Sequence, residues 1–382
     1  MARTPRIAHL TTVHAPFDPR IFHKQLRSLH TAGFDAHLVA PHDESERVHG
    51  VSIHGLPRPR HRIHRLALQP AMFRCARRLD AALYQIHDPE LLPLGVLLKA
   101  VTGARLIYDM HEDYRTKGPV LGRTLRGMER TAFPWIDHVL LAETSYRPIV
   151  ESAPVSHRVL PNYFRPIGEE GKTTSTENKA DEPSRLLYTG TLSARRGLRT
   201  MVELAGHIRQ SHRSETVDLV GVCHHADQRA WAERRIRRDD LGTVVERTGW
   251  DTYVRPSAMP PHYQQADVGL VLCEPDANYT GSYPTKFYEY LHYGLPIICS
   301  DFPLWRRFVE THNCGAVVPP GDPAAVLDVL DAWRAHPERY RQYVENARAA
   351  ATQYRWASVE ERLTSLYKRL LEEGDQSESA RR

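Results

Sequence analysis

The stretch from Asn278 to Asp301 constrains the fold of this 382-residue chain more than any other, and it reads NYTGSYPTKFYEYLHYGLPIICSD. Pro284 has a preset φ and no N–H, so it suits a first helical position. Gly294 suits the left-handed position just after a helix end. The apolar run from Leu295 to Cys299 is typical of a buried parallel strand. The stretch therefore predicts a loop, a short helix and a strand.

Two charged residues of the predicted helix suit a nucleotide. Lys286 and Glu289 are three positions apart, so they share one helix face near its N-terminus. A helix N-terminus with a lysine beside it attracts phosphate, and a carboxylate one turn on can accept hydrogen bonds from sugar hydroxyls. This predicts a diphosphate at the helix tip and a ribose at Glu289. An amphipathic helix with a solvated Lys–Glu pair fits the same spacing equally well.

The same stretch resembles a known family. The pattern P-T-K-x-x-E-Y-x-x-x-G-L-P is similar to the donor-binding segment of GT-B glycosyltransferases of family 4, which are retaining nucleotide-sugar transferases. Glu289 matches the second residue of that family's Glu-x7-Glu pair, but Gly281 stands where the first belongs. Some bacterial polysaccharide-type branches carry S-x-P-T-K here instead. The resemblance implies that Ser282, Thr285, Lys286 and Glu289 contact the donor.

The opening of the chain predicts a doubly wound sheet. Arg6 to Thr11 reads as a strand, Ile21 to Ala32 as a helix, and Asp35 to Ala40 as a second strand. No GxGxxG follows the first strand, which disfavours a dinucleotide site. Ligands of such sheets lie beyond the C-terminal ends of the strands, so Asp18 and Arg20 in the first loop are candidates for acceptor binding. A proline-stiffened turn with a local ion pair fits them equally well.

A second N-terminal patch, HDPELLPLG followed by YDMHED, also resembles family 4. In that family a histidine at the end of this strand lies near the donor sugar, and His111 matches it. We place His87 and Asp109 on the acceptor side. A metal site in DMHED is disfavoured because neighbouring strand residues point to opposite faces, and the resemblance implies no bound metal. Helix capping by Asp109 and Glu112 is the structural alternative.

Glycines and arginines mark a second phosphate site. The loop G-T-L-S-A-R-R-G from Gly190 leads into a predicted helix, and Arg195 and Arg196 would form a diphosphate clamp because arginine binds phosphate bidentately. Family 4 typically reads G-R-L-x-x-x-K-G here. Arg196 therefore matches the lysine, and Thr191 replaces the arginine, for which Arg195 could compensate. A solvated turn with two surface arginines is the alternative.

Composition divides the chain into segments. Residues 166–184 are polar and lack aromatic side chains, which is typical of a linker. We expect an acceptor-side Rossmann-like domain at 1–165 and a donor-binding one at 185–351. A helix at 352–372 would cross back to the first domain, as the resemblance implies. Residues 373–382 are expected to be a disordered tail.

Charge and cysteine content indicate where the chain works. The five cysteines are scattered without metal spacing, and no run of eighteen apolar residues or signal peptide is found. The expected compartment is therefore the cytoplasm. The net charge of +5 gathers in Arg58 to Arg78 and again around Arg126. These clusters suit phosphate-bearing partners or an anionic inner membrane face. The sequence shows no strongly hydrophobic stripe, so we expect such membrane contact to be electrostatic. A solvated arginine-rich surface fits the clusters as well.

The sequence thus predicts an α/β protein of GT-B class, with two Rossmann-like domains. The implied reaction is transfer of a sugar from a nucleoside diphosphate sugar, with UDP favoured, to a glycan, a lipid-linked intermediate or a small molecule. Besides this co-substrate we expect neither a cofactor nor a nucleic-acid partner, because no nucleic-acid-binding motif occurs. A GT-B nucleotide-sugar epimerase and a non-catalytic nucleotide-binding relic remain open. The residues expected to carry the chemistry are His111, Arg196, Lys286 and Glu289.

Overall fold

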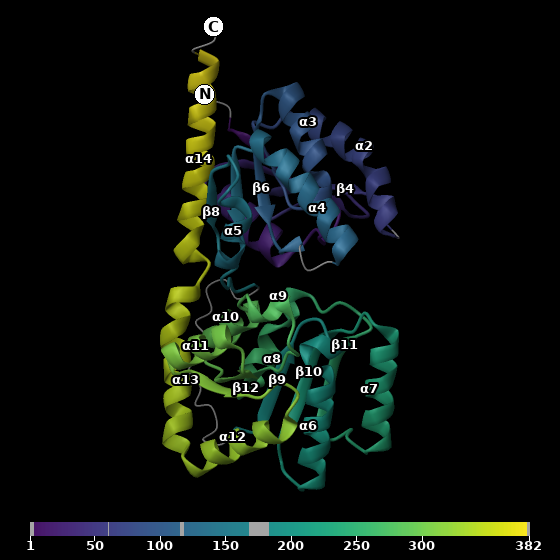
Figure 1. The fold of residues 1–382 in the computed structure, drawn as a ribbon, viewed down its shortest axis with the longest axis vertical. Helices are drawn as coiled ribbons and strands as arrows, with labels where there is room; N and C mark the ends of the chain where they lie inside the picture. The colour runs from purple at the N-terminus through teal and green to yellow at the C-terminus, as the bar shows by residue number, and fades with distance from the viewer. Residues whose placement is uncertain (1–3, 60, 115–117, 168–182, 380–382) are drawn as a thin grey trace. The chain divides into compact units, whose positions relative to one another are not determined.

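The computed structural model describes residues 4–59, 61–114, 118–167 and 183–379 (Figure 1). The chain forms two compact units, which we call the N-terminal unit, Met1–Arg165 with Trp356–Arg382, and the C-terminal unit, Pro166–Arg355. Most of the expected linker lies outside the described residues. None of the described helices is both long and apolar enough to cross a lipid bilayer.

The N-terminal unit contains an eight-stranded sheet in the order β3-β4-β2-β1-β5-β6-β7-β8. All neighbours pair in parallel except β3 and β4. The chain thus runs outward from β1 to either side, which is the doubly wound order expected from the opening residues. The strands are β1 Arg6–Leu10, β2 Asp35–Pro41, β3 Glu46–Val48, β4 Val51–Leu56, β5 Leu83–Ile86, β6 Arg105–Met110, β7 His138–Leu141 and β8 His157–Val159.

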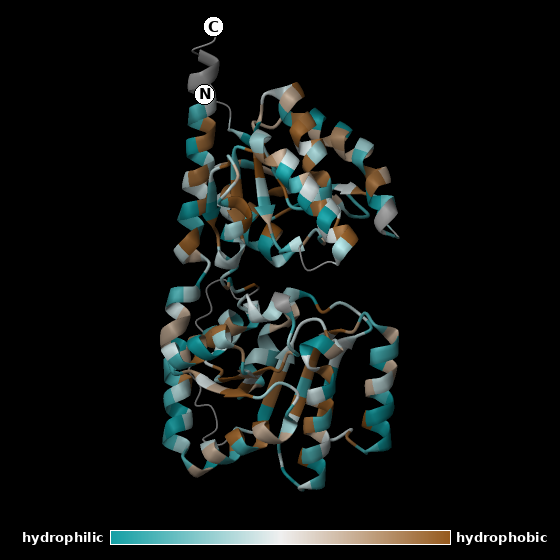
Figure 2. Cartoon of the chain, in the orientation of Figure 1, coloured by the Kyte–Doolittle hydropathy of each residue, from teal (hydrophilic) through white to brown (hydrophobic). Residues whose placement is uncertain are grey.

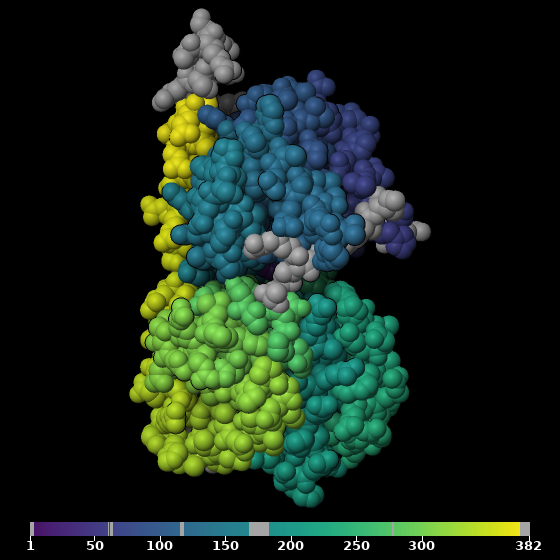
Figure 3. Space-filling view, viewed as in Figure 1, coloured from purple at the N-terminus to yellow at the C-terminus, as the bar shows by residue number. Residues whose placement is uncertain are grey.

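Helices cover both faces of this sheet because strand residues alternate between them. In β1, Ala8 packs with α2 and α3, whereas Ile7 packs with the final helix, α14. Figure 3 shows α3 and α4 at the surface of this unit. The expected helix at 21–32 begins earlier, as a π-helical turn at Pro19–Leu26. The α-helices are α1 Arg27–Thr31, α2 Arg62–Leu79, α3 Leu92–Thr102, α4 Pro119–Ala132, α5 Arg147–Val150 and α14 Ala357–Ser379.

The final helix α14 belongs to the N-terminal unit and places an apolar stripe against its sheet. Trp356, Leu363 and Tyr367 are buried with Ile7 and Phe22 in one cluster. The helix continues to Ser379, through most of the segment expected to be a disordered tail. The extra turns contain no proline, and Arg369 pairs with Glu373 one turn later, which supports helix formation.

The C-terminal unit contains a six-stranded parallel sheet in the order β11-β10-β9-β12-β13-β14. The strands are mostly apolar, whereas α7 is strongly hydrophilic (Figure 2). The strands are β9 Arg185–Thr189, β10 Thr216–Val222, β11 Val245–Trp250, β12 Val268–Val271, β13 Ile297–Ser300 and β14 Gly315–Val318. The helices are α6 Leu198–Gln210, α7 Ala226–Arg238, α8 Pro260–Gln265, α9 Ala277–Thr280, α10 Thr285–His292, α11 Pro303–His312, α12 Pro323–Ala335 and α13 Pro337–Ala351.

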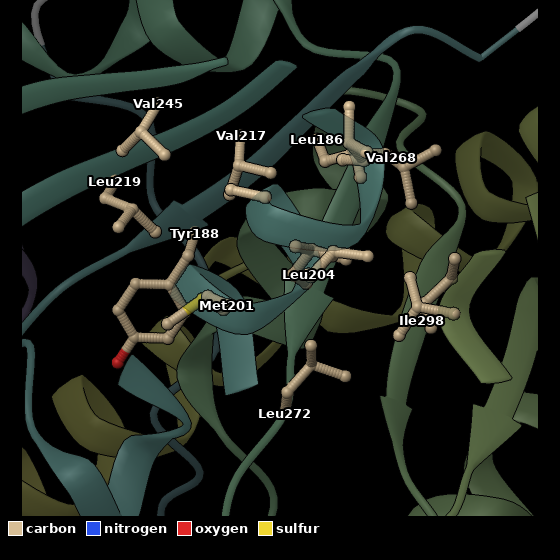
Figure 4. Packing of buried hydrophobic residues seen from close by; sticks show 14 of the residues in the cluster. Leu186, Tyr188, Met201, Leu204, Val217, Leu219, Val245, Val268, Leu272 and Ile298 are labelled. Carbon is tan, nitrogen blue, oxygen red and sulfur yellow. The ribbon is translucent and has the colours of Figure 1, made fainter. Parts of the chain in front are cut away.

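The core of this unit lies between the sheet and α6. Leu186, Tyr188 and Leu219 from the strands meet Met201 and Leu204 of α6 (Figure 4). All five side chains are fully buried, so this layer holds β9 and its following loop in place. That loop carries the predicted phosphate clamp.

The stretch that opened the sequence analysis contains the predicted helix and strand, but its first residues belong to the short helix α9 and not to a loop. Pro284 caps α10 rather than occupying its first turn. Gly294 has a φ of +62°, and a Cβ there would lie 2.7 Å from Nε of Arg348. The left-handed position and the close neighbour both require glycine. Strand β13 follows and pairs with β12 and β14.

Candidate active-site residues

In the C-terminal unit, two cations lie close together at the N-terminus of α10. The Nζ atom of Lys286 is 5.1 Å from the ring centre of Tyr188. Arg196 donates a hydrogen bond to the hydroxyl of Tyr279 at 3.3 Å. Burial, helped by the positive charge of Arg196, lowers the pKa of Lys286 to about 8. Arg196 itself keeps its proton, because the pKa of its guanidinium is raised, against the effect of burial, by nearby tyrosine hydroxyls. A buried cation held next to another cation is an arrangement that suits an anionic ligand.

Glycines let the backbone approach this pair of cations. Gly190 has a φ of +107°, and a Cβ on it would lie 3.0 Å from Nζ of Lys286. Gly197 has a φ of +83°, and a Cβ there would lie 2.0 Å from the backbone oxygen of Leu272. Both φ values are strained for any other residue, so the loop that carries Arg196 requires glycine at both ends.

The other predicted residues of this loop point elsewhere. Arg195 has a side chain that is 75% exposed and pairs with Asp276 at 3.0 Å. Its partner lies outside the Lys286–Arg196 pair, so the structure separates the two adjacent arginines. The backbone oxygen of Thr191 accepts a hydrogen bond from Tyr188 at 2.8 Å, which ties the loop to the aromatic ring under Lys286.

Glu289 lies one turn into α10 and accepts a hydrogen bond from the hydroxyl of Tyr263 at 2.6 Å. The Tyr263 ring stacks on Tyr293 with centres 4.7 Å apart. Burial and the Glu289 charge raise the pKa of Tyr263 well above its usual range, so it remains a donor. The sequence analysis missed this partner, which precedes β12 in a separate helix.

The loop before α10 positions the remaining donor candidates. Trp305 of α11 donates its indole N–H to the backbone oxygen of Ser282 at 2.8 Å. Thr285 is the first residue of α10 and is half-buried, whereas Gly281 is exposed in the preceding loop. The S-x-P-T-K segment is thus held by Trp305 at Ser282 and by the start of α10 at Thr285.

In the N-terminal unit, polar side chains gather where β1, β5 and β6 end. The carboxyl ends of parallel strands meet at one edge of the sheet, and ligands bind there. Asp109 in β6 is fully buried and accepts two hydrogen bonds from Arg20, at 2.6 and 3.0 Å. Burial alone would raise the pKa of Asp109, but the charge of Arg20 and the neighbouring His111 hold it well below its usual range.

Both residues of the first loop have internal partners. Asp18 accepts hydrogen bonds from the backbone N–H groups of Arg20 and Ile21, at 2.8 and 2.9 Å, and so caps the π-helical turn. The guanidinium of Arg20 reaches Asp109 and the backbone oxygen of Leu160 instead of pairing with Asp18. The alternative of a local ion pair between Asp18 and Arg20 is not found, because Asp18 caps the turn and the guanidinium of Arg20 pairs with Asp109.

His111 follows β6 directly and lies against this ion pair. Its Nε2 atom is 3.0 Å from Nδ1 of His87 and 3.1 Å from Oδ2 of Asp109. The ring of His14 packs on it with centres 4.5 Å apart. Burial lowers the pKa of His87 to about 4, so His87 is neutral near pH 7.

A cation could fit among His87, Asp109 and His111 by distance alone, since one ligand atom from each lies within 4.8 Å of the others. Strand alternation does not separate Asp109 from His111, because they are two residues apart and share a face. Asp109 is already bound by Arg20, whose positive charge opposes a metal ion at the same carboxylate.

Comparison with known proteins gives two family matches. Residues 20–162 match the Glycosyl transferase 4-like domain, and residues 183–333 match Glycosyl transferases group 1. A phosphatidyl-myo-inositol mannosyltransferase from Mycobacterium leprae is 26% identical over 143 residues, which is 37% of this chain and 37% of that protein. This match thus spans little more than a third of the relative.

Solved structures match over nearly the whole chain. Sucrose-phosphate synthase from Thermosynechococcus elongatus has a TM-score of 0.73 at 18% identity, covering 96% of this chain and 99% of that one. Anabaena HepE, solved in complex with UDP and glucose, has a TM-score of 0.73 at 14% identity, covering 95% and 99%. A glycosyltransferase from Rickettsia africae scores 0.71 at 12% identity, covering 96% and 99%. These likenesses confirm the expected GT-B fold.

Proposed function

This chain belongs to the group 1 glycosyl transferases, a retaining family of nucleotide-sugar-dependent enzymes also known as family 4, and from that premise we propose that its donor is a UDP-sugar. The expectation of uridine is supported by HepE, a protein of the same fold that was solved with UDP and glucose. The acceptor in this proposal is a lipid-linked intermediate or a glycan.

The paired cations at α10 carry the donor proposal. Lys286 and Arg196 lie close enough for the arginine to lower the pKa of the lysine, an arrangement that a bound diphosphate would relieve. The leaving diphosphate becomes more negative in the transition state, so fixed cations stabilise it there most. Glu289 would hold the ribose with the carboxylate lone pairs that the Tyr263 hydroxyl does not use.

His111 would contact the transferred sugar. The side chain is 11% exposed, and its ring is held by His87, Asp109 and His14, which suits a group that must orient a substrate. In the proposed reaction the acceptor hydroxyl attacks the sugar on the face from which the diphosphate leaves: the new glycosidic bond forms as the bond to the diphosphate breaks, and a departing phosphate oxygen takes the proton of the hydroxyl. Asp18 and Arg20 support this site indirectly, because Asp18 caps the π-helical turn and Arg20 binds Asp109.

A ligand screen tests the donor proposal. Binding stabilises the native state by mass action, about 2.7 kcal/mol at a hundredfold excess over Kd. UDP is expected to raise the melting temperature more than GDP or ADP do, and a UDP-sugar is expected to be consumed when an acceptor is added. Arg196→Ala should abolish the UDP shift, whereas Arg195→Ala should retain it as a matched control. Equal shifts in both variants would contradict the clamp, and UDP binding without turnover of any donor would favour a nucleotide-binding relic.

A second part of the proposal places the chain at an anionic membrane surface. Helices α2 and α4 expose arginines, among them Arg77, Arg78, Arg126 and Arg130. Exposed apolar side chains accompany them, which the sequence analysis did not expect. These are Leu66 at 55%, Leu97 and Val101 at 51%, Val120 at 76% and Trp135 at 60%. The named activity of the M. leprae relative on a phosphatidylinositol supports a lipid-linked acceptor.

Vesicle cosedimentation tests the membrane proposal. Each arginine near an anionic surface contributes roughly 1 kcal/mol, and salt screens this attraction. Binding to anionic vesicles should weaken with salt but persist in part, because the apolar side chains insert. Replacing Arg77 and Arg78 by Glu should reduce binding at low salt more than the same changes at Arg237 and Arg238, in α7 of the C-terminal unit. Absence of binding at low salt would remove this part of the proposal.

A further inference from the structure

Buried side chains beside His111 form a closed circuit of hydrogen bonds in the N-terminal unit. They come from the π-helical turn, from β1, β5 and β6, and from α14, and all but His111 are at most 1% exposed. The proposed function uses His111 and the two side chains that hold its ring, His87 and Asp109, and gives no role to the other members. The members are Asp109, Gln25, Gln85, Tyr367, His9, His87 and His111.

The first half of the circuit has a fixed direction. Asp109 is an ionised carboxylate, paired with Arg20, and can only accept. Gln25 therefore turns its amide nitrogen toward Asp109, at 2.7 Å. This leaves the Gln25 oxygen to accept from Nε2 of Gln85 at 2.6 Å. The Gln85 oxygen in turn accepts the hydroxyl proton of Tyr367 at 2.5 Å.

The second half follows from the first. Because Tyr367 gives its only proton to Gln85, it must accept from Nε2 of His9, 2.8 Å away. Burial lowers the pKa of His9 well below its usual range, so His9 is neutral and its Nδ1 carries a lone pair. That lone pair accepts from Nε2 of His87 at 3.0 Å. His87 is neutral as well, so its Nδ1 also carries a lone pair.

The circuit ends at His111 and decides which nitrogen carries its proton. Nδ1 of His87 and Oδ2 of Asp109 both face Nε2 of His111, at 3.0 and 3.1 Å. Both atoms are acceptors, so Nε2 of His111 must be protonated. A reversed circuit would place the Gln25 oxygen 2.7 Å from the Asp109 carboxylate, which is repulsive. Two longer contacts of 3.4 Å oppose this assignment and are not hydrogen bonds in it: Nε2 of Gln85 and Nε2 of His87 are both donors, and Nδ1 of His87 and Oδ2 of Asp109 are both acceptors. The contacts that fix the direction are all shorter, at 2.5 to 3.1 Å.

We propose that Tyr367 is a positioning residue, which acts through His9 and His87 to hold His111 in its Nε2–H form and thereby reserves Nδ1 as an acceptor for a hydroxyl of the donor sugar. The assignment of the sugar rests on the proposed function, whereas the protonation pattern does not. A C-terminal helix thus determines the chemistry of a residue 256 positions earlier in the sequence.

The test compares two variants that each lose one buried hydroxyl. In Tyr367→Phe, His9 loses its acceptor at Nε2 and is free to move its proton to Nδ1, which would reverse His87 and disturb His111. Tyr84→Phe is the matched control, because its hydroxyl is buried in the same unit but bonds to the backbone oxygen of Ala76 at 3.0 Å. Both variants should keep the fold.

Nitrogen-15 NMR of labelled histidines reads the proton positions directly, with His9→Gln, His87→Gln and His111→Gln recorded to assign the signals. In the wild type at pH 7 we expect His9 and His87 as neutral Nε2–H forms and His111 protonated at Nε2. Tyr367→Phe should give mixed signals for His9 and His87, and Tyr84→Phe should give the wild-type pattern. Wild-type protons on Nδ1 of His9 or His87 would overturn the proposal even if the variant does not fold.

Kinetics test the consequence for the sugar. With the donor found by the ligand screen, Tyr367→Phe should lower kcat about tenfold while KM changes by less than about twofold, because a transition-state contact is disturbed. Tyr84→Phe should leave both unchanged. A tautomer change with unaltered kcat would overturn the link to catalysis. A chain that shows the expected NMR pattern but transfers no sugar would refute the proposed function and leave the protonation pattern standing.

Discussion

The two charged centres of this protein differ in how their charges are neutralised. In the N-terminal unit, Asp109 and Arg20 neutralise each other inside a closed set of hydrogen bonds. In the C-terminal unit, Lys286 and Arg196 have the same sign, and their closeness weakens the lysine's hold on its proton. The first centre is complete by itself and can fix a geometry. The second gains most when an anion arrives, which is the behaviour of a binding site.

Removing Arg20 should give the largest effect on stability. Arg20→Ala leaves the buried Asp109 carboxylate without its partner, which should cost about 3–5 kcal/mol of unfolding free energy. Urea unfolding measures it, and the exposed Arg195→Ala should change stability by less than about 0.5 kcal/mol. Because the pKa of Asp109 is depressed from 3.8, the wild type loses this contribution on acidification, and the difference should shrink at low pH. If both variants lose the same free energy of unfolding, the ion pair of Arg20 and Asp109 is not the stabilising centre described above.

Removing Lys286 should cost activity and leave stability intact. Lys286→Ala deletes the cation that we propose stabilises the leaving diphosphate, so kcat should fall about 10²–10³-fold, as for loss of one preorganised transition-state donor. The melting temperature of the free chain should stay level or rise, because the like-charge repulsion disappears. Initial rates and thermal melts measure the two effects. Full activity in the variant would show that Lys286 takes no part in the transfer.

Glu289→Ala tests whether Glu289 binds the ribose of the nucleotide. Loss of a hydrogen bond from a ribose hydroxyl to a charged group should weaken UDP binding by about 1.5–3 kcal/mol. Isothermal titration of UDP measures this, and circular dichroism checks the fold. Uridine and UDP should be affected alike, since the contact is to the ribose. A folded variant with wild-type affinity would refute the role of Glu289.

The smallest expected effect is the change of stability and of UDP affinity with pH. The pKa of Lys286 is lowered to about 8 from 10.5, so the unfolded chain holds this proton more tightly and the free chain gains stability as pH rises between these values. Affinity for UDP should move the other way and weaken about tenfold between pH 7 and 9 as the cation is lost. Lys286→Arg keeps its charge and should show a flat profile. If UDP affinity changes with pH in the same way in the wild type and in Lys286→Arg, a group other than Lys286 titrates.

Local chemistry made much of the C-terminal unit predictable. Pro284 and Gly294 bracket α10 through backbone constraints that act within a few residues, so the helix and the following strand could be predicted. Lys286 and Glu289 share a face by helical geometry alone. Their partners could not be predicted, because Tyr188 and Tyr263 come from β9 and α8, and only the sheet order brings these elements to α10.

The N-terminal site was predicted less well, because its interactions are long-range. Arg20 meets Asp109 across 89 positions, and His9 meets Tyr367 across 358. A histidine inside the apolar strand RIAHL was a visible signal for His9, but nothing local connects it to a tyrosine in the last helix. Spacing arguments treated Asp18 and Arg20 as a neighbouring pair and therefore missed that capping separates them.

The attachment of α14 to the N-terminal unit has a consequence for synthesis on the ribosome. Leu363, Tyr367 and Leu370 fill a core that also contains Ile7 and Leu29, so the N-terminal unit cannot finish folding until α14 has been translated. The C-terminal unit, which is continuous in sequence, can be complete by then. Domains usually fold from the N-terminus onward during translation. Here the order of completion is reversed, and a nascent chain halted before residue 356 carries a finished C-terminal unit and an N-terminal sheet with one uncovered face.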